Sequence, residues 1–108
     1  MWLRTLGFNG VMLEPGMANP PMYPDDAKLY PVYEISRQRG AHVLFTLSAF
    51  VGSDISYSTP VHMDRGAADL PDLKLIIRHA CWPWVTETCG MAFRRENVYL
   101  IPDAYGVR

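Results

Sequence analysis

Histidine is the side chain best suited to acid–base or metal chemistry near neutral pH, and the chain has three: His42, His62 and His79. His79 follows the apolar run 73–78 and precedes the start of a predicted helix. Parallel α/β proteins bind their ligands at such strand ends. His42 precedes an apolar run instead, and His62 lies inside a predicted helix. His79 is therefore the candidate for a catalytic or metal-binding residue, and the alternative is a structural histidine that caps a carbonyl group.

Other side chains with useful chemistry also stand near predicted strand ends. Glu14 and Asp103 each follow an apolar run, and each is either a catalytic carboxylate or a solvated loop residue. Thr46 belongs to the end of a second run, and Trp84 follows His79 closely enough to form a pocket wall. We predict that Glu14, Thr46 and Trp84 line a substrate pocket around His79.

A zinc site built from His79, Cys81 and Cys89 is a competing interpretation. The spacing H-x-C-x7-C matches no common structural zinc pattern. Cys89 is also expected on the apolar face of a helix, a face that it shares with Val85, Ala92 and Phe93. The chain has no glycine-rich phosphate loop, no G-x-S-x-G motif and no H-E-x-x-H motif.

The elements that must position these residues alternate along the chain. Continuous apolar segments predict buried strands, and segments with helical spacing, proline at the start and glycine or basic residues at the end predict helices. Strands are expected at 10–14, 43–47, 73–78 and 97–101, with helices at about 31–40, 59–70 and 82–95. Strands joined through helices run parallel. The fold class is therefore α/β, either an open doubly wound sheet or part of a (β/α)8 barrel.

Composition limits the function classes. The 108 residues suit one domain, 1–108, and 49% hydrophobic with 19% charged residues is ordinary for a globular chain. A net charge of -1 gives no basic surface for nucleic acid, and no apolar run approaches the length of a membrane span. Two cysteines are too few for a disulfide scaffold. A reduced cytoplasmic protein is expected.

Four segments, taken together, resemble the amidohydrolase-related TIM-barrel proteins, which include the aminocarboxymuconate-semialdehyde and resorcylate decarboxylases and many metal-dependent hydrolases. They are residues 6–13, 23–34, 70–79 and 96–100. The resemblance implies that the chain corresponds to about strands four to seven of a partial barrel. It also implies that His79 matches a histidine of a divalent-metal site, with zinc the expected ion. The family pattern there usually reads His-Gly-Gly, and Ala80 and Cys81 stand in for the glycines.

The sequence departs from the family at one position of that site. Thr46 stands where the resemblance implies a metal-binding histidine, and threonine is a poor ligand for a divalent transition metal. The resemblance implies metal-dependent hydrolysis or decarboxylation of a small carboxylated substrate by a full-length parent, with this chain alone inactive. One alternative is a degenerate, non-catalytic half-barrel that forms homo-oligomers through its exposed edges. Another is a free-standing small α/β binding domain.

Overall fold

A computed structural model of the protein describes residues 10–101. Its four strands form one parallel sheet in the order β1-β2-β3-β4, so that each strand pairs with the next one in the sequence. The strands are β1 (Gly10–Leu13), β2 (His42–Ser48), β3 (Leu75–Trp82) and β4 (Val98–Ile101). A doubly wound sheet reverses its strand order at a switch point, whereas barrel strands follow one another in sequence. The observed order is that of a barrel segment.

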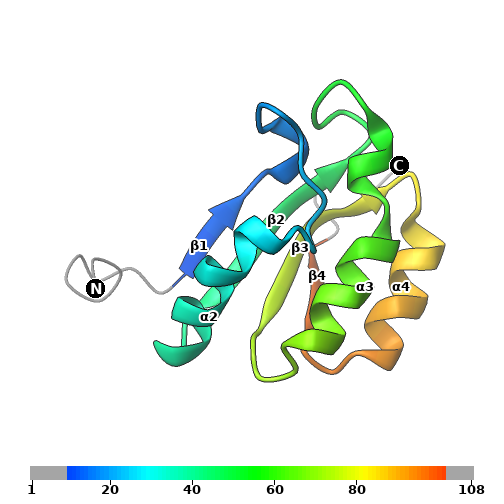
Figure 1. Ribbon diagram of the computed structural model, residues 1–108. Coiled ribbons are helices and arrows are strands. Elements are labelled where there is room, and N and C mark those ends of the chain that lie inside the picture. Colours follow the sequence, from blue (N-terminus) through cyan, green and yellow to red (C-terminus); the bar gives the residue numbers. More distant parts are fainter. Residues whose placement is uncertain (1–9, 102–108) are drawn as a thin grey trace.

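Three helices join the strands and cover one face of the sheet (Figure 1). They are α2 (Tyr30–Gln38), α3 (Pro60–Asp69) and α4 (Val85–Arg94), and short 3-10 turns stand at η1 (Pro15–Met17), η2 (Ala27–Leu29) and η3 (Ile55–Ser58). Proline occupies the first or second position of α2 and α3, where no backbone N–H is needed. Within residues 10–101, no helix has the length and apolar character that crossing a bilayer requires.

The predicted strands and helices are all present, with shifted bounds, of which two are notable. β3 continues to Trp82 instead of stopping at residue 78, so α4 begins at Val85 and not at residue 82. β2 likewise begins at His42, which the sequence pattern had placed just before the strand. Both differences have the same origin, because backbone pairing with a neighbouring strand extends an element beyond its apolar run.

The hydrophobic core lies between the sheet and its helices. Alternate strand residues point into it, and helix residues close it from the other side. Its fully buried members include Val43, Phe45, Leu47, Leu75 and Ile77 from the sheet, with Tyr33 and Met63 from α2 and α3. The intervening strand residues face the opposite side, which in a barrel is the interior. We call this side of the sheet the inner face.

Helix α4 is rotated relative to the sequence prediction. Thr88 and Met91 are its buried residues, whereas Cys89 is exposed and the Phe93 side chain is 93% exposed. The prediction that Cys89 and Phe93 face the core is therefore wrong. The error arose because apolar residues were taken to mark the buried face. Thr88 is buried instead because its hydroxyl donates a hydrogen bond to the carbonyl oxygen of Trp84 at 2.6 Å.

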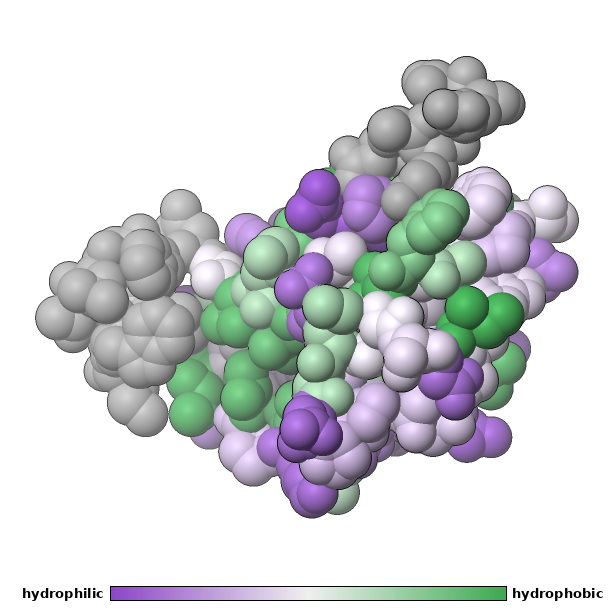
Figure 2. Space-filling model, turned by 90° about the horizontal axis from the view of Figure 1, so that it is seen from above, coloured by the Kyte–Doolittle hydropathy of each residue, from purple (hydrophilic) through white to green (hydrophobic). Residues whose placement is uncertain are grey.

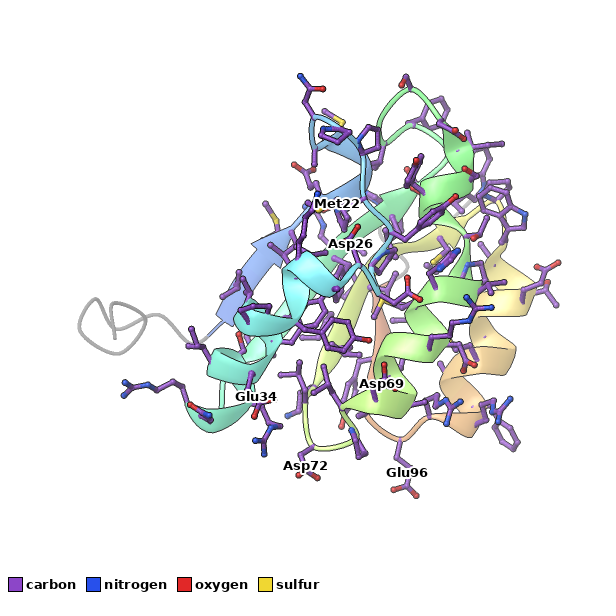
Figure 3. The ribbon with its side chains drawn as sticks, in the orientation of Figure 1. Met22, Asp26, Glu34, Asp69, Asp72 and Glu96 are labelled. Carbon is purple, nitrogen blue, oxygen red and sulfur yellow. The ribbon has the colours of Figure 1, made fainter. Side chains whose placement is uncertain are left out.

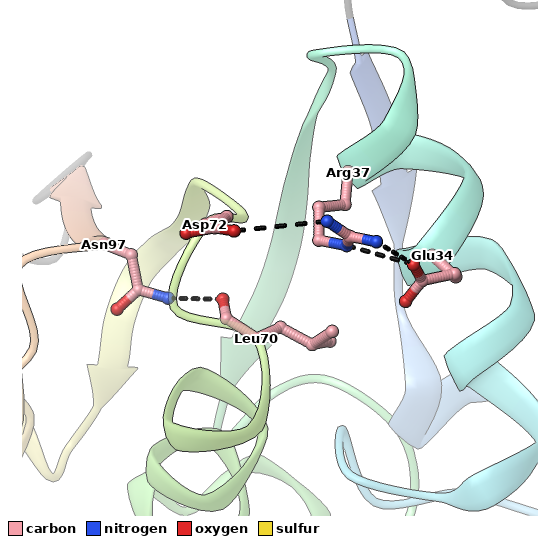
Figure 4. A network of polar contacts seen from close by, with 5 residues as sticks. All are labelled: Glu34, Arg37, Leu70, Asp72 and Asn97. Carbon is pink, nitrogen blue, oxygen red and sulfur yellow. Dashed lines mark hydrogen bonds and ion pairs between the residues drawn. The ribbon is translucent and has the colours of Figure 1, made fainter.

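Polar contacts join the helices to neighbouring loops at the end of the molecule where the strands begin. The Asn97 side-chain amide lies within 3.0–3.3 Å of the carbonyl oxygens of Ala67, Leu70 and Leu73, and it thereby closes the turn after α3. Figure 4 shows this amide with a second contact group, in which Arg37 lies between Glu34 and Asp72. These contacts hold α3 and α2 against the loops that feed β3 and β4.

Candidate functional site

The inner face presents its side chains in rows, because paired strands bring residues of equal register side by side. One row holds Gly10 and His42. The next holds Met12, Leu44, Ile76 and Tyr99, and a third, nearest the strand ends, holds Thr46, Arg78 and Ile101. The inner face is therefore apolar in its middle row and carries a cation and a hydroxyl in the row closest to His79.

His79 lies in the last part of β3, and its backbone conformation there is unusual. His79, Ala80 and Cys81 have φ values of 66°, 50° and 55°, so three consecutive non-glycine residues adopt the left-handed region. Each such residue costs about 1–2 kcal/mol relative to ordinary backbone, and strain of this kind persists only where surrounding structure enforces it. The imidazole is half-buried, with its Nδ1 atom buried. β3 therefore holds His79 in a defined place at the strand end.

The left-handed backbone at residues 79–81 explains why the family pattern has glycines after this histidine. The family pattern implied by resemblance has glycines after this histidine, and glycine adopts positive φ without steric cost. Ala80 and Cys81 keep that conformation despite their Cβ atoms. The signal for a special backbone was thus hidden in this sequence, because the residues that usually reveal it are replaced.

The structure does not assemble the competing zinc site from His79, Cys81 and Cys89. Cys81 is fully buried in the core, and burial raises the pKa of its thiol to about 12. A thiol with that pKa stays protonated at neutral pH, whereas zinc binds the thiolate. Cys89 is exposed on α4. Within residues 10–101, no three His, Cys, Asp or Glu side chains come together in a way that could hold a metal ion.

Thr46 is a buried polar residue of the inner face. Its side chain is in the row of Arg78, and the residue is 5% exposed. Its Oγ1 atom is buried and has no hydrogen-bond partner among the described residues. Most buried hydroxyls in proteins are hydrogen-bonded, so this atom requires an explanation.

Arg78 is a candidate site residue that the sequence reasoning did not name. It pairs with Thr46 on one side and Ile101 on the other, and it is half-buried. The signal was available in the run 73–78, because strand residues alternate between faces and Ile77 is an obvious core residue. An arginine in phase with the opposite face is placed on the interior side of a barrel.

Aromatic residues stand around the strand ends. The rings of Phe50 and Trp82 are stacked, with centroids 5.6 Å apart and planes 6° from parallel. Ala49 donates its backbone N–H to the carbonyl oxygen of Trp82 at 2.7 Å, which joins the ends of β2 and β3. Trp84 is half-buried at the position before α4. Figure 2 looks onto this end of the molecule, where apolar side chains gather beside polar ones.

The remaining predicted site residue, Glu14, is exposed and follows β1 directly. Leu13 pairs with Phe45, so Glu14 continues β1 toward the level of Thr46. Glu14 thus follows β1, whereas His79 lies in the last part of β3, with β2 between the two strands. Asp103 lies outside the described residues.

The other two histidines have structural surroundings. The ring of His42 lies directly over Gly10, where any Cβ atom would collide with it. His62 is in α3, as predicted, and its Nδ1 lies 2.8 Å from Asp25 Oδ1 while its ring stacks on Tyr23 at 3.9 Å. These contacts join α3 to the loop that precedes α2. Neither histidine lies at the carboxyl end of a strand, because His42 begins β2 and His62 is in α3.

Comparison with known proteins gives two matches. The sequence model of a family described as amidohydrolase matches residues 2–105. A crystal structure of an uncharacterized TIM-barrel protein from Bordetella bronchiseptica is 43% identical, with a TM-score of 0.89, over 96% of this chain and 37% of that chain. No curated protein matches. The prediction of a partial barrel is confirmed, and the chain spans 37% of the length of this TIM-barrel protein.

Proposed function

The chain belongs to the amidohydrolase family, and from this membership we propose that its strand ends contribute to the active site of a barrel enzyme. The reaction we propose is hydrolysis or decarboxylation of a small carboxylated substrate. The observation that supports it best is His79, held by a left-handed backbone run at the end of β3. Ligands of (β/α)8 barrels bind at this end of the strands.

The family's divalent metal is a separate question, because the residues described here do not fit a metal centre. Thr46 stands where the resemblance implies a histidine, and no group of three metal-binding side chains exists within residues 10–101. A catalytic zinc normally has three protein ligands. We infer that any zinc in the complete site needs ligands from outside this region, and that this chain alone is inactive.

The role we propose for His79 is proton transfer. In hydrolysis a neutral imidazole takes the proton of the attacking water. In decarboxylation the bond between carbon and carboxylate breaks, its electron pair stays on the carbon, and that carbon takes a proton from the imidazolium while carbon dioxide leaves. Trp84 would form a wall of the pocket, and Glu14 would lie at its edge.

Nuclear magnetic resonance of the histidine rings tests this placement. Benzoate, a simple aromatic carboxylate, should shift the ring signals of His79 and leave those of His62 unchanged, because His62 belongs to α3 and is paired with Asp25. His62→Gln is the matched control, and it should bind benzoate as the unaltered chain does. Absence of any benzoate response at His79 would reject the proposed site.

Metal analysis of the same preparations tests the second statement. We expect less than one equivalent of metal in the unaltered chain and no difference in His79→Ala. One equivalent of zinc that disappears in His79→Ala would show that the chain does hold a metal centre through this histidine.

A second candidate is a non-catalytic half-barrel that self-associates. It is favoured by the inner face, where Met12 and Tyr99 are 56% and 48% exposed, and by β1 and β4, each of which pairs on one side only within the described residues. Apolar faces and strand edges are normally covered, and a second copy could cover both. Sedimentation decides: a monodisperse monomer at high concentration contradicts this candidate.

A further inference from the structure

We propose that the exposed face of α4 is a docking surface for α4 of a second copy of this chain. We call this face the α4 stripe, and it consists of Thr86, Cys89, Gly90 and Phe93. The inference does not depend on the proposed function. It is carried by the exposure of one aromatic ring on the stripe, by the open space above its glycine and by two opposite charges beside it.

The spacing of the α4 stripe is that of a helix–helix interface. Its four residues follow one another at i, i+3, i+4 and i+7, so they share one side of the helix. All four are exposed, and the Phe93 side chain is 93% exposed. Figure 3 shows α4 at the flank of the helix layer, beyond α3 as seen from α2. The described residues therefore leave this side of α4 uncovered.

Phe93 and Gly90 form a protrusion and a hollow on the same stripe. A Cβ atom at Gly90 would meet no side chain or distant backbone atom within 4 Å. Alanine would therefore fit there in a single copy, and it favours a helix more than glycine does. Two α4 helices packed antiparallel around a twofold axis bring Phe93 of each copy over Gly90 of the other. The missing side chain then provides room for the ring.

The charges beside the stripe complement each other in the same arrangement. Glu87 and Arg94 are exposed, and they lie seven residues apart on one flank of the stripe. Neither has an ion-pair partner within residues 10–101, and the carboxylate of Asp64 on α3 is already bonded to Arg95. Residues on the same flank face each other in an antiparallel helix pair. Glu87 of each copy thus faces Arg94 of the other, and the surface is complementary to itself.

The size of this contact determines how strong the dimer should be. One helix pair buries less area than the standard interface of about 1,200–2,000 Å², so we expect a weak dimer that forms at high concentration. The half-barrel association through the inner face would use the opposite side of the sheet from the helices. Variants on the two sides therefore distinguish the two modes of association.

Sedimentation equilibrium of the whole chain, from tens of micromolar to about 1 mM, tests the proposal. We expect a monomer–dimer equilibrium that Phe93→Ser weakens at least about 10-fold. Gly90→Leu should weaken it by a similar factor, because the new side chain fills the space for the ring, although leucine is apolar and a good helix former. Ile55→Ser removes an exposed apolar residue outside α4. It is the matched control and should leave the dimer unchanged.

Charge reversal provides an independent test. Glu87→Arg and Arg94→Glu should each weaken the dimer about 3-fold or more, because like charges then face each other. The double variant should restore the dimer, because the ion pairs form again with their signs exchanged, and circular dichroism should show an unchanged fold. A double variant as weak as the single ones would overturn the antiparallel α4 contact. A chain that stays monomeric up to about 1 mM, or a dimer that survives Phe93→Ser and is lost in Tyr99→Ser, would overturn it as well.

Discussion

The two faces of the sheet are made from alternate residues of the same four strands, yet their physical properties differ. On the helix side, Val43, Phe45 and Ile77 are completely buried. On the inner face, Met12 and Tyr99 are about half exposed. The buried hydroxyl of Thr88 on the helix side donates a hydrogen bond, whereas that of Thr46 on the inner face has no partner among the described residues.

The helix side of the sheet contributes mainly to stability, and the inner face is where we propose the chemistry takes place. Burial of apolar area on the helix side supplies most of the favourable free energy of folding. The inner face carries groups that a hydrophobic core would reject, namely a half-buried arginine and a buried hydroxyl without a hydrogen-bond partner among the described residues. Barrels in general place their variable, reactive residues at this end of the strands for the same reason.

The largest expected difference in the free energy of unfolding is between alanine variants of two adjacent isoleucines of β3. Ile77 faces the helices and is completely buried, whereas Ile76 faces the inner side and is only partly buried. Ile77→Ala should lower the free energy of unfolding by about 2–5 kcal/mol, the range for buried aliphatic truncations. Ile76→Ala should cost about 1 kcal/mol or less, because less area is lost from burial. Urea denaturation measures both.

The same pair tests the inner face for a partner. If a second copy covers this face, Ile76 becomes a core residue of the assembly. Its truncation would then approach the cost of Ile77→Ala and would depend on protein concentration. Equal, concentration-dependent losses in the two variants would contradict the contrast between the faces.

Two alanines give the next contrast. Ala67→Gly, in the buried part of α3, should cost about 1.5–2 kcal/mol, from helix propensity and the loss of one buried methyl group. Ala80→Gly should change stability by less than about 0.5 kcal/mol, because relief of the left-handed backbone offsets the lost methyl group. Thermal or urea unfolding of both variants is the measurement. If Ala80→Gly lowers the free energy of unfolding as much as Ala67→Gly does, the backbone of residues 79–81 is not strained.

The fold could be predicted because apolar segments and helix boundaries carry local signals. Apolar runs such as 43–47 indicate buried strands. Pro60 marks the start of α3, and Leu70 directly follows its last residue. The parallel sheet then follows from the alternation of elements. The choice between a doubly wound sheet and a barrel did not follow from these signals, because strand order depends on contacts between distant segments.

The candidate site was predicted less completely. His79 was proposed from its place after an apolar run, and this role stays a prediction. Its left-handed conformation was not predicted, since the residues that follow it, Ala80 and Cys81, are not glycines. Arg78 was overlooked although strand alternation identifies its face. The rotation of α4 was missed because buried Thr88 is stabilised by a hydrogen bond to Trp84 that composition does not reveal.

Two threonines, one on each face, give opposite expected signs. Thr88→Val removes a buried hydrogen bond on the helix side and should cost about 1 kcal/mol. Thr46→Val removes a buried hydroxyl that has no partner in the described region and should be neutral or stabilising by up to about 1 kcal/mol. Parallel urea titrations decide, and a loss in Thr46→Val equal to that in Thr88→Val would show that its hydroxyl is already hydrogen-bonded in the free protein.

The smallest expected effect concerns pH and belongs to the helix side alone. Arg95 of the segment after α4 holds Asp64 of α3 through Nε–Oδ1 and Nη2–Oδ2 contacts of 2.9 and 3.3 Å, and this hydrogen bonding lowers the pKa of Asp64. A carboxylate whose pKa is lower in the folded than in the unfolded state stabilises the fold above its unfolded pKa and loses that contribution as the pH falls through the folded pKa. Asp64→Asn should therefore make the free energy of unfolding depend less on pH in the acidic range. The change in free energy should be smaller than that of Thr88→Val, because the Asp64–Arg95 pair is partly solvated. Arg78→Gln should leave this pH dependence unchanged, and an equal reduction by both variants would mean that the two sides of the sheet are not electrostatically independent.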